Sequence, residues 1–163
     1  FDMASKSLRL IFSLTLLWFI SSFPLHKHPL YIDQLENLVM GPDKRLLDAL
    51  DDDEYTPRSE LKEKFDIILE RQSEKIKKDY ADEVELQEKR RNHLDDLHRS
   101  SLHIEDRPLF DQIRTIRADL TLSLHMAQKR EKELWLKIEH NERMRHTMHD
   151  SDSGSHSDED FDD

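Results

Sequence analysis

The sequence predicts an all-α protein: a small helical bundle with one or two long amphipathic helices and a disordered acidic C-terminal tail. The 163-residue chain contains only two valines and two glycines, whereas Leu, Glu, Lys and Arg are abundant, and this composition favours helices over strands. The chain has no cysteine, so a packed helical core must supply the stability that disulfides give to many small exported domains. Apolar residues recur at spacings of three and four, the period of a helix with one buried face.

The N-terminal segment predicts export. Residues 8–20 are almost all apolar, Lys6 and Arg9 supply positive charge near their start, and two serines follow, a pattern typical of a secretory signal peptide. An apolar run of about 13 residues is shorter than the ~20 residues that span a bilayer. We therefore expect cleavage after Ser22 and an extracellular, secreted protein, with an uncleaved membrane anchor as the alternative.

The chain divides into four parts. Residues 1–22 are the predicted signal peptide, in which the two residues before Met3 are interpreted as upstream read-through. Residues 23–30 contain two prolines and predict an extended lead-in. Residues 31–149 form the predicted helical domain, and residues 150–163, rich in acids and serine, are too polar to fold and predict a disordered acidic tail.

The first half of the helical domain predicts two short helices and one long one. Residues 31–39 and 43–50 carry the two short apolar patterns, and the second is expected to bury Leu46, Leu47 and Leu50. Thr56 is predicted to cap a long helix with Pro57 at its first position. Its apolar stripe comprises Leu61, Phe65, Ile68, Ile76, Tyr80 and Val84.

The second half begins with a stretch that has no apolar residue. Residues 87–93 are either a solvated projection of the long helix or the place where it frays, and Leu94, Leu97 and Leu102 then resume the apolar face. Pro108 marks the next boundary, before a helix that continues to Leu120. A last helix is expected over 122–148. Its inward face comprises Leu124, Ala127, Leu134, Trp135 and Ile138, of which the last three could alternatively serve self-association.

Charge and motifs limit the functional classes. A formal charge of −11 repels nucleic acid and anionic lipid, so we expect no nucleic-acid partner and no membrane partner once the signal peptide is removed, whereas cations and basic proteins are compatible. The sequence has no cysteine, no glycine-rich phosphate loop, no Gly-x-Ser-x-Gly and no His-Glu-x-x-His. We therefore predict that the protein is not an enzyme.

An acidic turn follows the second short helix. Four residues fall at positions 3, 5, 7 and 12 of a calcium loop that would start at Ala49; they are Asp51, Asp53, Tyr55 and Glu60. Alanine stands at the first ligand position and Glu54 at the position that needs glycine. The sequence predicts at most a weak calcium or magnesium site at Asp51, Asp53 and Glu60; alternatively, these acids end one helix and stabilise the positive start of the next.

The histidines and the tail offer two further candidate sites. His146 and His149 lie one helical turn apart and could hold zinc or copper weakly. The expected alternative is that the histidines are scattered and exposed and form no metal site. In the tail, Ser153, Ser155 and Ser157 form a series that ends beside Asp158 and Glu159. Secretory kinases that recognise Ser-x-Glu could phosphorylate it, each phosphate adding about −1.5 to −2 charges. Glycosaminoglycan attachment at Ser153 and an unmodified solubilising tail are the alternatives.

A repeated pattern carries a family resemblance. An apolar helix end, an acidic turn and a threonine that opens a charged helix occur twice, at 46–57 and at 113–121, and residues 68–72 end in glutamine after an apolar start. This order of features resembles the SXP/RAL-type family of secreted nematode antigens and would cover about 41–145. The chain departs from that family in its short proline-poor lead-in and in Leu69, where an aromatic residue is common.

The resemblance implies an extracellular antigen with no established reaction and with suspected cation or small-ligand binding. Our leading hypothesis is thus a secreted, non-enzymatic helical protein that binds a cation, a small apolar ligand or a host protein, its apolar helix faces being either core or ligand groove. The alternative is an acidic extracellular matrix or calcium-buffering protein that acts through a modified tail. The sequence does not indicate an oligomeric state.

Overall fold

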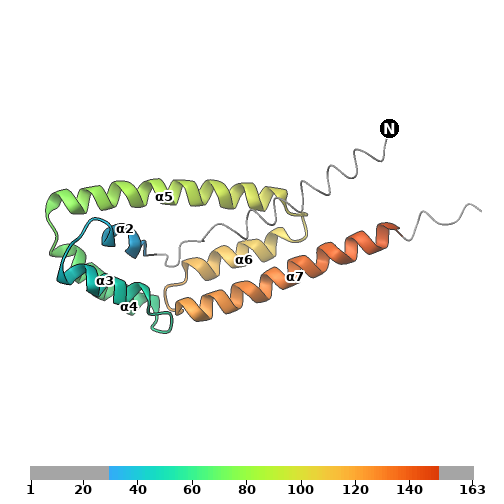
Figure 1. Cartoon of the computed structure of the whole chain (residues 1–163). Helices are drawn as coiled ribbons and strands as arrows, with labels where there is room; N and C mark the ends of the chain where they lie inside the picture. The colour runs from blue at the N-terminus through green and yellow to red at the C-terminus, as the bar shows by residue number, and fades with distance from the viewer. Residues whose placement is uncertain (1–29, 151–163) are drawn as a thin grey trace, which may run out of the picture.

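The computed structural model describes residues 30–150 and confirms the all-α class (Figure 1). The described part of the chain has no strand, and one isolated antiparallel bridge joins Pro57 to Ser123. Its helices are α2 (Ile32–Glu36), α3 (Pro42–Asp51), α4 (Arg58–Glu70), α5 (Glu74–Ser101), α6 (Arg107–Ala118) and α7 (Leu124–Asp150). The predicted signal peptide, the lead-in up to Pro29 and the tail from Ser151 on lie outside the described residues.

Two long helices frame the molecule. α5 has 28 residues and α7 has 27, and α6 lies between them (Figure 1). The short helices α2, α3 and α4 gather at the end of the molecule where α5 begins (Figure 1). No helix between residues 30 and 150 combines the length and the apolar character that crossing a membrane requires.

The first core lies among the short helices and the start of α5. Tyr80 of α5 reaches into it: its ring lies 5.6 Å from that of Phe65, and its hydroxyl donates a hydrogen bond of 2.9 Å to the carbonyl of Leu30. Burying this apolar surface is the main force that holds the short helices together. The buried members are Leu30, Ile32, Leu35, Val39, Leu47, Leu50, Leu61, Phe65 and Ile68.

The second core joins α6 and α7 to the end of α5. His98 packs between two aromatic side chains, with ring centroids 5.0 Å from Trp135 and 5.2 Å from Phe110. The buried members are Leu102, Phe110, Ile113, Leu134 and Ile138, with Trp135 packed against them. The predicted inward face of the last helix is therefore core, and Leu134, Trp135 and Ile138 do not form an exposed association surface.

The predicted long helix over 57–84 is wrong, because the chain breaks between α4 and α5. Ser73 caps α5 by accepting the backbone N–H of Ile76 at 3.4 Å. The Gln72 amide, which stands in the apolar stripe, donates to the carbonyl of Ile68 at 2.9 Å and to the carboxylate of Asp43 at 2.8 Å. A serine cap and a glutamine that turns back onto the preceding helix together end one helix and start the next.

Several leucines predicted to face inward are exposed. Leu46 is 48% exposed, and Leu94 and Leu97 of α5 are 59% and 53% exposed, whereas Leu47 is fully buried. α5 nevertheless runs without interruption through 87–93, so this stretch is a solvated projection and not a frayed end. The apolar spacing predicted where these helices lie correctly, but it assigned too many of their leucines to the buried face.

Adjacent leucines on α3 provide a matched test of the first core. Leu47→Ala should lower the free energy of unfolding by about 2–5 kcal/mol, because it removes a fully buried side chain. Leu46→Ala removes the same atoms from an exposed position and should change it by about 0.5 kcal/mol or less. Urea unfolding followed by circular dichroism measures both values, and equal losses would contradict the assignment of this core.

Candidate functional site

In the acidic turn, the carboxylate of Asp53 already accepts hydrogen bonds from neighbouring residues. The Asp53 carboxylate accepts the backbone N–H groups of Tyr55 at 3.1 Å and Thr56 at 2.9 Å, and the Thr56 hydroxyl at 2.8 Å. Hydrogen bonds from the Thr56 backbone and side chain hold the pKa of Asp53 below its usual value. Thr56 thus donates to Asp53 and does not cap α4, which begins at Arg58.

The predicted cation ligands are not gathered into one cluster. Glu60 is exposed on α4, and Asp51 ends α3. Among the side chains that the structure describes, no three His, Asp or Glu are arranged to hold a metal ion. These contacts support the alternative structural role for Asp53, and weak calcium or magnesium binding at Asp51, Asp53 and Glu60 stays a prediction.

The other predicted sites fall largely outside the described residues. The structure does not describe the side chains of His146 and His149, nor the tail residues Ser153, Ser155 and Ser157. His140, which precedes this pair on α7, is exposed. Metal binding at these histidines and modification of these serines therefore stay predictions.

The two loops that carry the repeated sequence pattern lie side by side. Loop 52–57 connects α3 to α4, and loop 119–123 connects α6 to α7. Each has an aspartate that accepts from a nearby threonine, since Asp119 accepts both the N–H and the hydroxyl of Thr121. The backbone bonds between the loops are Arg58 N–H to Leu122 O at 3.2 Å, Ser59 N–H to Leu120 O at 2.8 Å and His125 N–H to Glu54 O at 2.9 Å.

Arg58 stabilises the junction, by which we mean loops 52–57 and 119–123 and the contacts between them. Its side chain is only 2% exposed, and its guanidinium donates hydrogen bonds to four backbone carbonyls. The acceptors are Leu122 at 3.0 Å, Arg117 at 3.0 Å, Ile116 at 3.0 Å and Asp119 at 2.6 Å. Three belong to the end of α6, where the carbonyls carry partial negative charge. Two of these also accept a backbone N–H, whereas Arg117 O accepts only from Arg58 among the described contacts. Burial lowers the pKa of Arg58, while Asp119 and Glu131 oppose that change.

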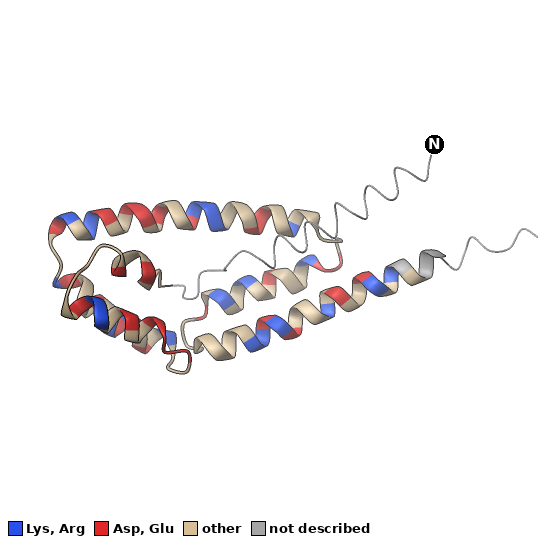
Figure 2. Ribbon diagram, viewed as in Figure 1, with Lys and Arg blue, Asp and Glu red and all other residues tan. Residues whose placement is uncertain are grey.

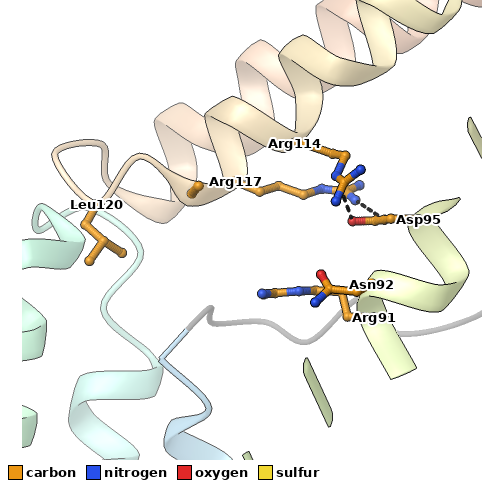
Figure 3. Close-up of a pocket in the computed structure, with 7 residues that line it drawn as sticks. Arg91, Asn92, Asp95, Arg114, Arg117 and Leu120 are labelled. Atoms are coloured by element: carbon orange, nitrogen blue, oxygen red, sulfur yellow. Dashed lines mark hydrogen bonds and ion pairs between the residues drawn. The ribbon is translucent and has the colours of Figure 1, made fainter. Parts of the chain in front are cut away.

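A cleft opens between α5 and α6, next to this junction. Its volume is about 300 Å³, and its lining residues are Arg91, Asn92, Asp95, Arg114, Arg117, Ala118 and Leu120. Figure 3 shows Arg91, Asn92 and Asp95 projecting from α5, with Arg114 and Arg117 approaching from α6. Positive and negative side chains are interspersed along α5 and α7 (Figure 2), so three arginines at one cleft are a local departure from the pattern.

The arginines of the cleft are unequally neutralised. Arg117 lies 3.3 Å from Asp95 and 3.0 Å from Glu131 of α7. Arg114 lies 3.8 Å from Asp95 and 3.4 Å from the exposed Asp96. Arg91 instead lies over the ring of Tyr31, 5.7 Å from its centroid, and no carboxylate of the described residues lies within ion-pair distance of it.

Sequence reasoning missed both Arg58 and the cleft. An arginine in the first turn of an amphipathic helix is normally solvated, and no feature of the sequence marks Arg58 as buried. The spacing of Arg91 and Asp95, and of Arg114 and Arg117, places each pair on one helix face. Only the packing of α5 against α6 reveals that these two faces meet.

A comparison of the chain with models of known families, with curated proteins and with solved structures finds no match. The resemblance to the nematode antigens therefore stays a prediction.

Replacing Arg58 should destabilise the whole domain. Arg58→Met keeps an apolar stem but removes four buried hydrogen bonds and leaves the Arg117 carbonyl without its donor. We therefore expect a loss of about 3 kcal/mol or more in the free energy of unfolding. Arg58→Lys should be intermediate, because an ammonium cannot reproduce the guanidinium fork. Arg90→Met, at an exposed position of α5, is the control; urea unfolding that gives equal losses for the Arg58 and Arg90 variants would contradict the proposed role.

His98 should make stability fall in mild acid. Burial among the rings holds its pKa below 6.5, with Arg117 adding to the effect and Asp95 opposing it, so the folded protein keeps the ring neutral while the unfolded chain binds a proton. The contribution is complete above about pH 6.5 and is lost as the pH falls from there through the folded pKa. Thermal unfolding between pH 7.5 and 5 should show a larger decrease in melting temperature for the wild type than for His98→Gln; parallel curves would exclude this role.

Proposed function

We propose that the protein is an exported, non-enzymatic helical domain that binds a small ligand in the cleft between α5 and α6. The observation that carries this proposal is the cleft itself: about 300 Å³, with polar side chains that converge from two helices. Ligand sites in proteins have volumes of about 300–1,000 Å³ and a few converging polar groups. A volume at the lower limit, with a mostly polar set of lining side chains, suits a small polar molecule.

The remaining surfaces fit the other candidate ligands less well. The apolar helix faces pack into the two cores, which argues against a groove for an apolar ligand. Three guanidinium groups at the cleft repel a cation. Export rests on the apolar run at 8–20 with its flanking Lys6, Arg9 and Ser22, and the absence of a reaction rests on the lack of catalytic motifs in the sequence.

The family resemblance and the tail supply the rest of the proposal. An extracellular helical antigen of the SXP/RAL type would share the class and the export proposed here. The alternative function, calcium buffering by a modified tail, depends on residues 150–163 and is separable by deletion. If calcium uptake is unchanged without these residues, the tail does not perform it.

Native mass spectrometry of the protein collected from the medium of secreting cells tests the binding function. The native form should carry extra mass that denaturation removes. Ala118→Trp places a large ring in the cleft and should abolish that mass, whereas Ala81→Trp, at an exposed position of α5, should retain it. Equal native and denatured masses for the wild type, or cargo that survives in the Ala118 variant, would contradict binding at this cleft.

A further inference from the structure

We infer that the ligand of the cleft is a small oxyanion that carries at least two negative charges on phosphate or carboxylate groups, and that Arg91, Arg114 and Arg117 bind it. This inference rests on the proposed function and names the chemical class of its ligand. The charges, the contacts of Arg91 and the role of Asp95 support it in turn.

The lining of the cleft is positive in a chain that is otherwise acidic. Three arginines and one aspartate line the cleft, and the other lining residues, Asn92, Ala118 and Leu120, are neutral. Asp96 and Glu131, outside the lining, pair with Arg114 and Arg117, so the uncompensated charge is that of Arg91. The whole chain has the opposite balance, with 36 acidic residues against 25 lysines and arginines. A concentration of positive charge against the average composition favours a bound anion.

Arg91 is the least satisfied of the three arginines. Its contact among the described residues is with the face of the Tyr31 ring, a cation–π interaction that does not use the N–H donors of the guanidinium. Figure 3 shows its side chain turned into the cleft beside that of Asn92. A planar fork with unused donors, next to an amide that can also donate, matches a phosphate or carboxylate group.

Asp95 of α5 pairs unequally with the two arginines that α6 contributes to the cleft. Its carboxylate lies 3.3 Å from Arg117, but its distance of 3.8 Å to Arg114 is too long for a hydrogen bond. Arg114 is therefore only partly matched, since its other partner, Asp96, is exposed and contributes little. An incoming oxyanion can bridge Arg114 and Arg91 beside Asp95, with which it competes for the same guanidinium groups.

The net charge of −11 does not prevent this binding. At physiological ionic strength, charges more than about 8 Å away are largely screened, so the lining residues and their ion-pair partners Asp96 and Glu131 set the local potential and most of the remaining carboxylates do not. Long-range repulsion slows the approach of an anion and makes its association faster as salt is added. The arrangement therefore permits a small anion to bind an acidic protein.

Isothermal titration calorimetry on the full exported chain, at fixed ionic strength, tests the inference with sodium pyrophosphate, inorganic phosphate and succinate as probes. Binding of pyrophosphate or phosphate assigns a phosphoryl ligand, and binding of succinate assigns a carboxylate ligand; either supports the inference. Arg91→Ala should weaken the affinity about tenfold or more, whereas the neighbouring Arg90→Ala, which removes the same charge from the exposed face, should leave it nearly unchanged.

Asp95→Asn separates ligand binding from a structural role. If Asp95 competes with the ligand, its neutralisation should tighten binding, whereas a mere positioning role predicts weaker binding. Failure of all three probes, or equal effects of the Arg91 and Arg90 variants, would overturn the inference. Cargo that is uncharged but lost in Ala118→Trp would refute the anion while leaving the proposed function intact; cargo unaffected by Ala118→Trp would remove both.

Discussion

The fold depends on one side chain that crosses between two pairs of helices. Arg58 starts α4 but places its guanidinium against the carbonyls that end α6, so the α3–α4 pair and the α6–α7 pair are held at a fixed register. The backbone bonds between loops 52–57 and 119–123 add to this junction, but none of them reaches the carbonyl of Arg117, which accepts from the Arg58 guanidinium. Because Arg117 and Ala118 belong to that same helix end, the junction also fixes one wall of the cleft.

Arginine serves three purposes here because its surroundings differ. Arg58 is buried, and neutral carbonyl dipoles compensate its charge. Arg117 is held between Asp95 and Glu131, which joins α5, α6 and α7 through one guanidinium. Arg91 has only an aromatic face as its described partner. Arg58 contributes to structure alone, Arg117 both joins three helices and lines the cleft, and Arg91 retains the capacity to bind something that the chain itself does not supply.

The sequence predicted the fold class, the existence of most helices and the division between core and acidic turns. It failed where a local pattern has two meanings. Gln72 and Ser73 read as an imperfection in one apolar stripe, but their side chains end one helix and begin another. A second such pattern is the run of acids at 51–54: it predicts a weak cation site, which stays a prediction, and it also supplies Asp53, which accepts backbone N–H groups. Arg58 and the cleft could not be predicted, since burial of an arginine and the meeting of two helix faces are properties of the tertiary packing.

An acidic surface around a small positive cleft discriminates among anions by size. Repulsion from the surface grows with the charge that an approaching molecule brings near it, while attraction inside the cleft is limited to three guanidinium groups. A compact anion places all its charge within reach of those groups, whereas a polyanion such as nucleic acid leaves most of its charge facing carboxylates. The balance between repulsion by the surface carboxylates and attraction by the guanidinium groups of the cleft therefore favours small anions. Specificity here arises from repulsion of the wrong partner as much as from attraction of the right one.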